Sequence, residues 1–313
     1  MKRFAVCILI VMMLLTLGGC VSPFSENDTV GEYTPEIDPE PGNSLGSTVK
    51  VKLWIPLKNR RYFALLDQEI SVASGERTEM AVCKALLSQT QPGDILTAPG
   101  WSGLSVTDIS DDNQTLYVTL SREFLSPPTT DVVESARMAK AAVLSLANTL
   151  IGLKEYTQVQ FLVEMPTTGK VQRPTRKQAG FIGSDENAVL GLLMQQDELI
   201  LTPANAVELA LNAFESMDSL VLYDILYRTG MGAPDVFAFQ TVLQNLEHTV
   251  AEHQVLEVIE TDETHAIVYV DLTFSDGKEE YLVTRAPLAC RRENGVWKVE
   301  YTSFDELVLE SIH

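Results

Sequence analysis

The longest amphipathic stretch of the sequence, residues 131–151, limits the folds that the neighbouring segments can adopt. Its apolar residues recur alternately four and three positions apart, which places them on one face of a helix. Asp131 and Glu134 suit the positive end of the helix dipole, and Gly152 ends the pattern. Because the apolar face of this helix must be buried and predicted strands precede and follow it, the sequence predicts an α+β fold with helices on one face of a sheet.

The first folded region, residues 48–164, has the order strand, strand, helix, strand, strand, helix, strand. A period of two residues, typical of half-buried strands, marks the extended segments, and a helical period marks a shorter helix over 77–88. The predicted strands cover residues 49–56, 62–72, 104–109, 115–120 and 159–163.

The second folded region, residues 200–313, begins with helices and ends with strands. Thr202 and Pro203 form an N-cap followed by a proline at the first helical position. Asp276-Gly277 and Asn294-Gly295 separate successive strands and are typical of tight hairpin turns. The prediction is a helix-backed curved antiparallel sheet, with helices over 203–217, 219–228 and 235–250 and strands over 255–259, 265–274, 281–290 and 296–301.

The first nineteen residues have the pattern of a secretory signal peptide. Lys2 and Arg3 precede an apolar run over residues 4–17 that is too short to span a bilayer. The sequence Leu17-Gly18-Gly19-Cys20 resembles a bacterial lipobox, in which the cysteine thiol takes a diacylglyceryl group. We therefore expect a mature protein that begins at Cys20 and is lipid-anchored on the extracytoplasmic face of the cell membrane. The alternative is a fortuitous cysteine behind an ordinary signal peptide.

The distribution of charge distinguishes residues 20–47 and 200–313 from the rest of the chain, and it argues against anionic partners. Residues 20–47 are rich in proline and acidic residues without a single Lys or Arg, which predicts an extended tether. Residues 200–313 carry 6 basic and 20 acidic residues, a net charge of −14, within a chain of net charge −20. Such a balance argues against binding to nucleic acid and against general adhesion to anionic lipid.

Between the two folded regions, residues 165–199 are predicted to form a basic linker. Its prolines and glycines are typical of a loop. The basic side chains contact a phosphate-bearing wall polymer or an acidic partner in one interpretation. In the other, they belong to a solvated hairpin or linker. The four basic residues concerned are Lys170, Arg173, Arg176 and Lys177.

Two tryptophans are further candidates for partner binding. Trp54 lies on the polar face of the first predicted strand, beside Lys50 and Lys52. It is an interface anchor if it is exposed, and a core residue if a second layer covers it. Trp101 lies in a glycine-containing loop, where it either binds a partner or fastens its own loop.

The first folded region resembles the GerMN domain of the GerM-like sporulation and germination family. The resemblance lies in the order and spacing of several segments, namely VKVKLWIP, Arg61-Tyr62, TEMAVCKALL, SVTDISDDNQTLYVTLSREFLS and AVLSLANTL followed by EYTQVQFLVE. It implies a lipid-anchored envelope protein of a Gram-positive, spore-forming bacterium, with a fold suited to protein–protein packing. The second region resembles an NTF2-like domain in its element order and its terminal strand NGVWKVEYTSF.

Side chains for catalysis or metal binding are scarce. No nucleophile motif or phosphate-binding glycine loop occurs, so we predict no catalytic residue, no metal and no cofactor. His248 and His253 are five residues apart, so on a helix they would point away from each other and could not bind one metal ion. The best case for an enzyme is His265 with Asp271 on one strand face, with solvent exposure as the alternative. Cys83 and Cys290 are expected to be buried and unbridged.

These features together predict a non-enzymatic surface lipoprotein that acts in protein–protein assembly at the cell envelope during sporulation or germination. Its expected partners are the membrane, through Cys20, and other envelope or sporulation proteins. The alternative is an envelope hydrolase or small-ligand-binding protein that uses a pocket in the C-terminal region.

Overall fold

The computed structural model of the chain describes residues 46–89, 95–166, 168–183, 185–229 and 232–309. The predicted signal peptide, the lipidation of Cys20 and nearly all of the tether therefore lie outside the described residues. The predicted α+β class is confirmed, since both folded regions combine helices with mostly antiparallel sheets.

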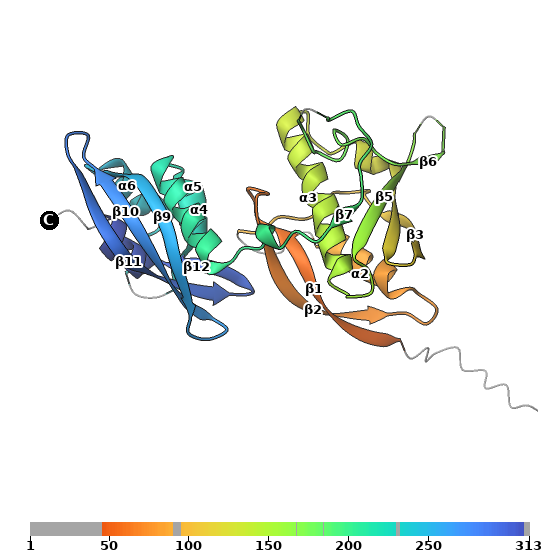
Figure 1. Ribbon diagram of the computed structural model, residues 1–313, viewed down its shortest axis with the longest axis horizontal. Helices are drawn as coiled ribbons and strands as arrows, with labels where there is room; N and C mark the ends of the chain where they lie inside the picture. The colour runs from red at the N-terminus through yellow and green to blue at the C-terminus, as the bar shows by residue number, and fades with distance from the viewer. Residues whose placement is uncertain (1–45, 90–94, 167, 184, 230–231, 310–313) are drawn as a thin grey trace, which may run out of the picture. The chain divides into compact units, whose positions relative to one another are not determined.

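The chain's first described element is a long hairpin. Strands β1 (Ser47–Pro56) and β2 (Phe63–Val72) run antiparallel, with Ser47 opposite Val72 and Pro56 opposite Phe63. Leu53 and Ile55 are fully buried while Lys50 and Lys52 are exposed, as a half-buried strand requires. Helices α2 (Thr78–Leu87) and α3 (Val132–Ile151) both contact the hairpin, drawn in orange beside α3 in Figure 1.

A second sheet covers the other side of these helices. It contains β3 (Val106–Asp112), β4 (Thr115–Leu120), β5 (Gln158–Glu164) and β6 (Val171–Gln172) in that order. Strands β4 and β5 are parallel, so α3 serves as the crossover between them. The sequence predicted one sheet, but α2 and α3 contact both the hairpin and this sheet. Residues 141–151 of α3 are therefore all buried. The single apolar stripe in the sequence predicted burial of only one face of this helix.

The segment 165–199 differs from the predicted linker because it extends this second sheet. Strand β6 pairs with β5 near Val163, and β7 (Leu193–Met194) pairs with the beginning of β5. Gly180 has a φ of +78° and lies so close to α3 that a Cβ there would be 1.9 Å from the carbonyl oxygen of Ala136. Only glycine therefore lets the backbone lie against the helix at this point.

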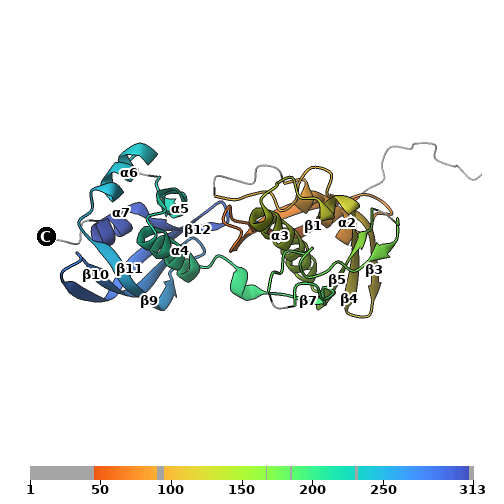
Figure 2. The ribbon, with the colours of Figure 1, turned by 90° about the horizontal axis from the view of Figure 1, so that it is seen from above.

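The C-terminal region is a helix-backed sheet with strand order β8-β12-β11-β10-β9. Along β10 every second residue is buried, and α4 contacts the sheet (Figures 1 and 2). All neighbouring strands are antiparallel except β12 and β8. The elements are α4 (Pro203–Glu215), α5 (Ser219–Ile225), β8 (Leu226–Tyr227), α6 (Val236–Gln244), β9 (Thr249–Glu260), β10 (His265–Ser275), β11 (Glu280–Glu293), β12 (Val296–Glu300) and α7 (Tyr301–Phe304).

The third helix of this region is shorter than predicted. It ends at Gln244, and β9 begins at Thr249, so the prediction of helix over 235–250 is wrong at its C-terminal end. Val250 is buried opposite Phe274 of β10, and this pairing outweighs the local helical pattern. His248 and His253 are therefore not on a helix, and the reason given for their divergence does not apply.

Candidate functional site

A concave surface of the first region lies beside the β1–β2 hairpin. This hairpin groove has a volume of about 800 Å³ and is lined by both strands, the end of α3, Gln195 and Ile200. Its rim carries charges of both signs, and Lys50 forms an exposed ion pair with Glu69 at 3.2 Å. Apolar side chains between polar rims are typical of surfaces that bind proteins. The charged lining residues are Lys50, Lys52, Asp67, Glu69 and Lys154.

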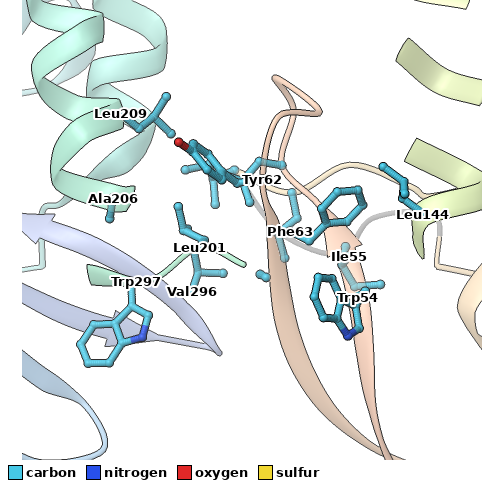
Figure 3. Close-up of a cluster of buried hydrophobic side chains, with 14 of the residues drawn as sticks. Trp54, Ile55, Tyr62, Phe63, Leu144, Leu201, Ala206, Leu209, Val296 and Trp297 are labelled. Atoms are coloured by element: carbon cyan, nitrogen blue, oxygen red, sulfur yellow. The ribbon is translucent and has the colours of Figure 1, made fainter. Parts of the chain in front are cut away.

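Trp54 belongs to the core, the second of the two alternatives for this residue. Its side chain is only 3% exposed, and its ring packs on Phe63 with centroids 6.0 Å apart. Figure 3 shows Trp54 and Phe63 together with Ile55 and Leu144. Because α3 covers this end of β1, the backbone N–H of Trp54 donates to the Thr149 hydroxyl at 3.0 Å. Trp54 thus fixes the floor of the groove and offers little surface to a partner.

Trp101 fastens its own loop, again the second alternative. Its Nε1 donates to the carbonyl oxygen of Glu123 at 3.2 Å. The ring is stacked on Phe124, with centroids 6.1 Å apart and an interplanar angle of 21°. Glu123 and Phe124 belong to the short 3-10 helix η2 (Arg122–Leu125), which follows β4. The partly exposed tryptophan therefore connects its loop to this helix.

The four basic residues of 165–199 have separate surroundings. Lys177 pairs with Glu186 at 2.8 Å, and Arg176 lies over the ring of Phe181, 5.8 Å from its centroid. Lys170 and Arg173 are exposed, and no ion pair of either is found within the described residues. Arg176 and Lys177 therefore interact with residues of the same segment. For Lys170 and Arg173, the alternative of solvated side chains fits best.

A polar network around the buried Glu79 is a feature of the first region that the sequence did not predict. Arg77 donates to Glu79 at 3.1 Å and to Asp111 at 2.8 Å, while the Tyr156 hydroxyl donates to Glu79 at 2.5 Å. Glu79 and Tyr156 are 6% and 8% exposed. The network joins the first turn of α2 to β3 and to the segment before β5. No sequence pattern indicates it, because Asp111 and Tyr156 are far along the chain from Arg77 and Glu79.

The electrostatics of this network stabilise one protonation state. Burial opposes ionisation of Glu79, but hydrogen bonds from Arg77 and Tyr156 outweigh it and lower the pKa of the carboxyl group. Burial and the Glu79 carboxylate raise the pKa of Tyr156 to about 12. Glu79 is thus ionised and Tyr156 neutral near neutral pH. A fully partnered set of this kind fixes structure and leaves no free group for general acid–base chemistry.

The histidines of the C-terminal region do not form the predicted alternative site. His265 pairs with Asp262 at 3.0 Å in the turn before β10, and Asp271 accepts from the Arg285 N–H at 2.7 Å. His265 and Asp271 share the face predicted, but six residues of strand place them about 20 Å apart. They are therefore not brought together.

A second cavity, of about 570 Å³, lies on the C-terminal sheet where β9 and β10 meet the end of α4. Its acidic lining residues are Glu215, Glu252 and Asp271. The Nδ1 of His253 is 2.6 Å from a Glu215 carboxylate oxygen, which makes this the one carboxylate–imidazole pair of the cavity. A search of the described residues finds no group of three or more His, Cys, Asp or Glu able to hold a metal ion.

Residues 46–164 match the model of the Germane family, described as sporulation and spore germination. The match confirms the predicted resemblance of the first region to the GerMN domain. This part of the chain is thus similar to a domain described as acting in sporulation and spore germination.

Two solved structures are similar to the chain. One, described as a lipoprotein from Clostridium perfringens, is 15% identical, covers 39% of this chain and 79% of its own, and has a TM-score of 0.24. The other contains the tandem GerMN domains of the sporulation protein GerM from Bacillus subtilis. It is 14% identical, covers 78% of this chain and 61% of its own, and has a TM-score of 0.29. None of the curated proteins matches the chain. Among the described helices, none is both long and apolar enough to cross a membrane.

Proposed function

We propose that this protein is a non-enzymatic lipoprotein, anchored through Cys20, whose Germane domain binds other envelope proteins during sporulation or germination. The observation that carries the proposal is the match of residues 46–164 to a sporulation and germination family. The hairpin groove is the surface of that domain that we assign to the partner. The lipobox-like sequence before Cys20 supports the anchor.

The geometry of the hairpin groove favours a rigid protein partner. Its two strands pair over ten consecutive residue pairs, and Trp54 holds the floor against α3. A preorganised surface of this kind loses little conformational entropy when it binds. Lys52 and Asp67 lie opposite each other across the hairpin and line the groove, so charges of both signs contribute to selectivity.

Charge reversal in the groove tests the docking role. Lys50→Glu combined with Lys52→Glu changes two exposed residues that line the groove. We expect the double variant to fold normally and to lower the yield of heat-resistant or germinating spores. The control is Lys278→Glu, an exposed lysine in the turn between β10 and β11. Equal spore yields for the double variant, the control and the wild type would contradict the role of the groove.

Substitution of the lipobox cysteine tests the anchor separately. Cys20→Ala removes the thiol that would be acylated, so the protein should move from the membrane fraction to the medium or remain unprocessed. The measurement is fractionation of cells followed by immunoblotting and intact-mass analysis. Unchanged fractionation of the variant would exclude the anchor and leave the docking role to be tested by the groove variants.

The alternative is an envelope hydrolase or small-ligand-binding protein that uses the second cavity. The pairing of His253 with Glu215 in a cavity of about 570 Å³ supports it. Turnover of an envelope substrate by the wild type, abolished in His253→Ala, would favour this alternative. Thermal stabilisation by a small ligand in the wild type but not in the variant would favour a binding protein.

A further inference from the structure

Strand β9 forms an open edge of the C-terminal sheet. It is the last strand in the order β8-β12-β11-β10-β9, and no other strand of the described residues pairs with its outer side. It is twelve residues long, and nine of these are exposed. The backbone N–H and C=O groups along such an edge can pair with another extended chain.

The side chains on β9 expose apolar surface beside this edge. Leu256, Val258 and Ile259 are 40%, 37% and 42% exposed. Val258 lies opposite Val268, a buried residue, and Ile259 opposite Ile267 on the other face. A strand added alongside β9 would cover apolar side chains on both faces. The outer strand β3 of the other sheet is a useful contrast, since none of its apolar residues is exposed.

Charge selects the kind of segment that can pair here. β9 contains no Lys or Arg, and it carries Glu252, Glu257 and Glu260. Glu257 pairs with Arg285 at 2.5 Å, whereas Glu252 and Glu260 have no ion pair among the residues described. Glu252 also lines the cavity shared with Glu215 and Asp271. A second copy of the chain would bring the same acidic strand to the edge, which like-charge repulsion disfavours.

We propose that β9 binds an extended, Lys- or Arg-containing segment of a partner protein. The segment adds to the sheet as one further strand, and one of its basic side chains enters the cavity between Glu215, Glu252 and Asp271. The inference rests on the proposed docking function and deepens it, because it assigns a second surface and the chemistry of the partner.

Synthetic peptides and the full-length chain in a non-ionic detergent test this inference. The first peptide alternates Lys or Arg with Val, and the second has Glu at every basic position. Binding is followed by fluorescence anisotropy and by amide hydrogen exchange. We expect the basic peptide to bind and to slow exchange within 249–260, and the acidic peptide not to bind.

Two variants and a control make the result specific to β9. Glu252→Lys should weaken basic-peptide binding roughly three- to tenfold, because reversal replaces an attraction by a repulsion at an exposed site. Val258→Lys should weaken binding by removing an exposed apolar contact. Leu220→Lys, at a position 60% exposed on α5, is the matched control and should bind as the wild type does.

The inference is overturned if neither peptide binds, if both bind equally, or if protection appears outside β9. It is also overturned if light scattering finds a dimer that Val258→Lys dissociates, because the occupant would then be a second copy. These results would leave the proposed function intact. Conversely, if β9 binds the basic peptide while the groove and Cys20→Ala variants have no effect in cells, the proposed function fails and the β9 site remains.

Discussion

Replacing Glu79 by glutamine removes the charge at the centre of the polar network in residues 46–164. The carboxylate accepts hydrogen bonds from Arg77 at 3.1 and 3.3 Å and from the Tyr156 hydroxyl at 2.5 Å. The glutamine has nearly the same shape and keeps one carbonyl oxygen, so the packing around 6%-exposed Glu79 should persist. The loss is therefore mainly electrostatic.

The size of the effect follows from the partners that remain. Hydrogen bonds to a charged group contribute about 1.5–3 kcal/mol, and removal of one partner of a fully buried pair costs about 3–5 kcal/mol. Arg77 keeps Asp111 at 2.8 Å and is 41% exposed, so its charge is not stranded. We therefore expect Glu79→Gln to lower the free energy of unfolding by about 2 kcal/mol. Glu69→Gln, which alters the exposed pair with Lys50, should change it by less than about 1 kcal/mol.

The effect should depend on pH in a defined direction. The folded-state pKa of Glu79 lies below its ordinary value of 4.5, so the unfolded chain binds more protons as the pH falls through this range. The contribution of Glu79 is complete above its unfolded pKa and is lost as the pH falls through the folded pKa. The difference in stability between the wild type and Glu79→Gln should therefore shrink as the pH falls below about 4.5.

Urea unfolding followed by near-ultraviolet circular dichroism measures both effects. The wild type, Glu79→Gln and Glu69→Gln are compared at neutral pH and again in acid. Tyr156→Phe and the double variant with Glu79→Gln complete a cycle, and the two losses should be less than additive because both remove the same hydrogen bond. Equal stabilities of Glu79→Gln and Glu69→Gln at neutral pH, or a difference that grows in acid, would refute this reasoning.

Two further predictions concern other parts of the fold. Gly180→Ala should lower the free energy of unfolding by about 2–4 kcal/mol, because the new Cβ would clash with the Ala136 carbonyl oxygen and because the φ angle of this residue is positive. Gly191→Ala is the control: its Cβ would have no neighbour within 4 Å, so the melting temperature should change little. The thiols of Cys83 and Cys290 should resist alkylation until the protein is denatured, because both are buried. Burial raises the pKa of both thiols, and it raises the pKa of Cys290 to about 12. Rapid alkylation of either thiol in the native protein would contradict this prediction.

The sequence predicted the bounds and burial of those helices and strands whose structure depends mainly on their own residues. Helix α3 begins where Asp131 predicts it, and the carboxylate of that residue accepts from the N–H groups of Val133 and Glu134. Strand β4 has the predicted bounds, and β10 has the predicted alternation of buried and half-exposed residues.

The sequence was least informative where distant partners decide the outcome. The helical pattern at 245–250 yields to the pairing of Val250 with Phe274. The segment 165–199 looks like a linker because its contacts with β5 and α3 involve only short stretches such as β6 and β7. The assembly of Arg77, Glu79, Asp111 and Tyr156 depends on the meeting of α2, β3 and the segment before β5, which no local spacing encodes.

Photo-crosslinking in sporulating cells tests the central proposal most directly. A photoreactive residue replaces Lys52 in the hairpin groove of the full-length protein, and a control carries it in place of the exposed Lys84 on α2. We predict an adduct with an envelope protein from position 52, formed during sporulation and not during vegetative growth, and no such adduct from position 84. Equal labelling from both positions, or no adduct from the groove at any stage, would contradict a Germane domain that docks through this surface.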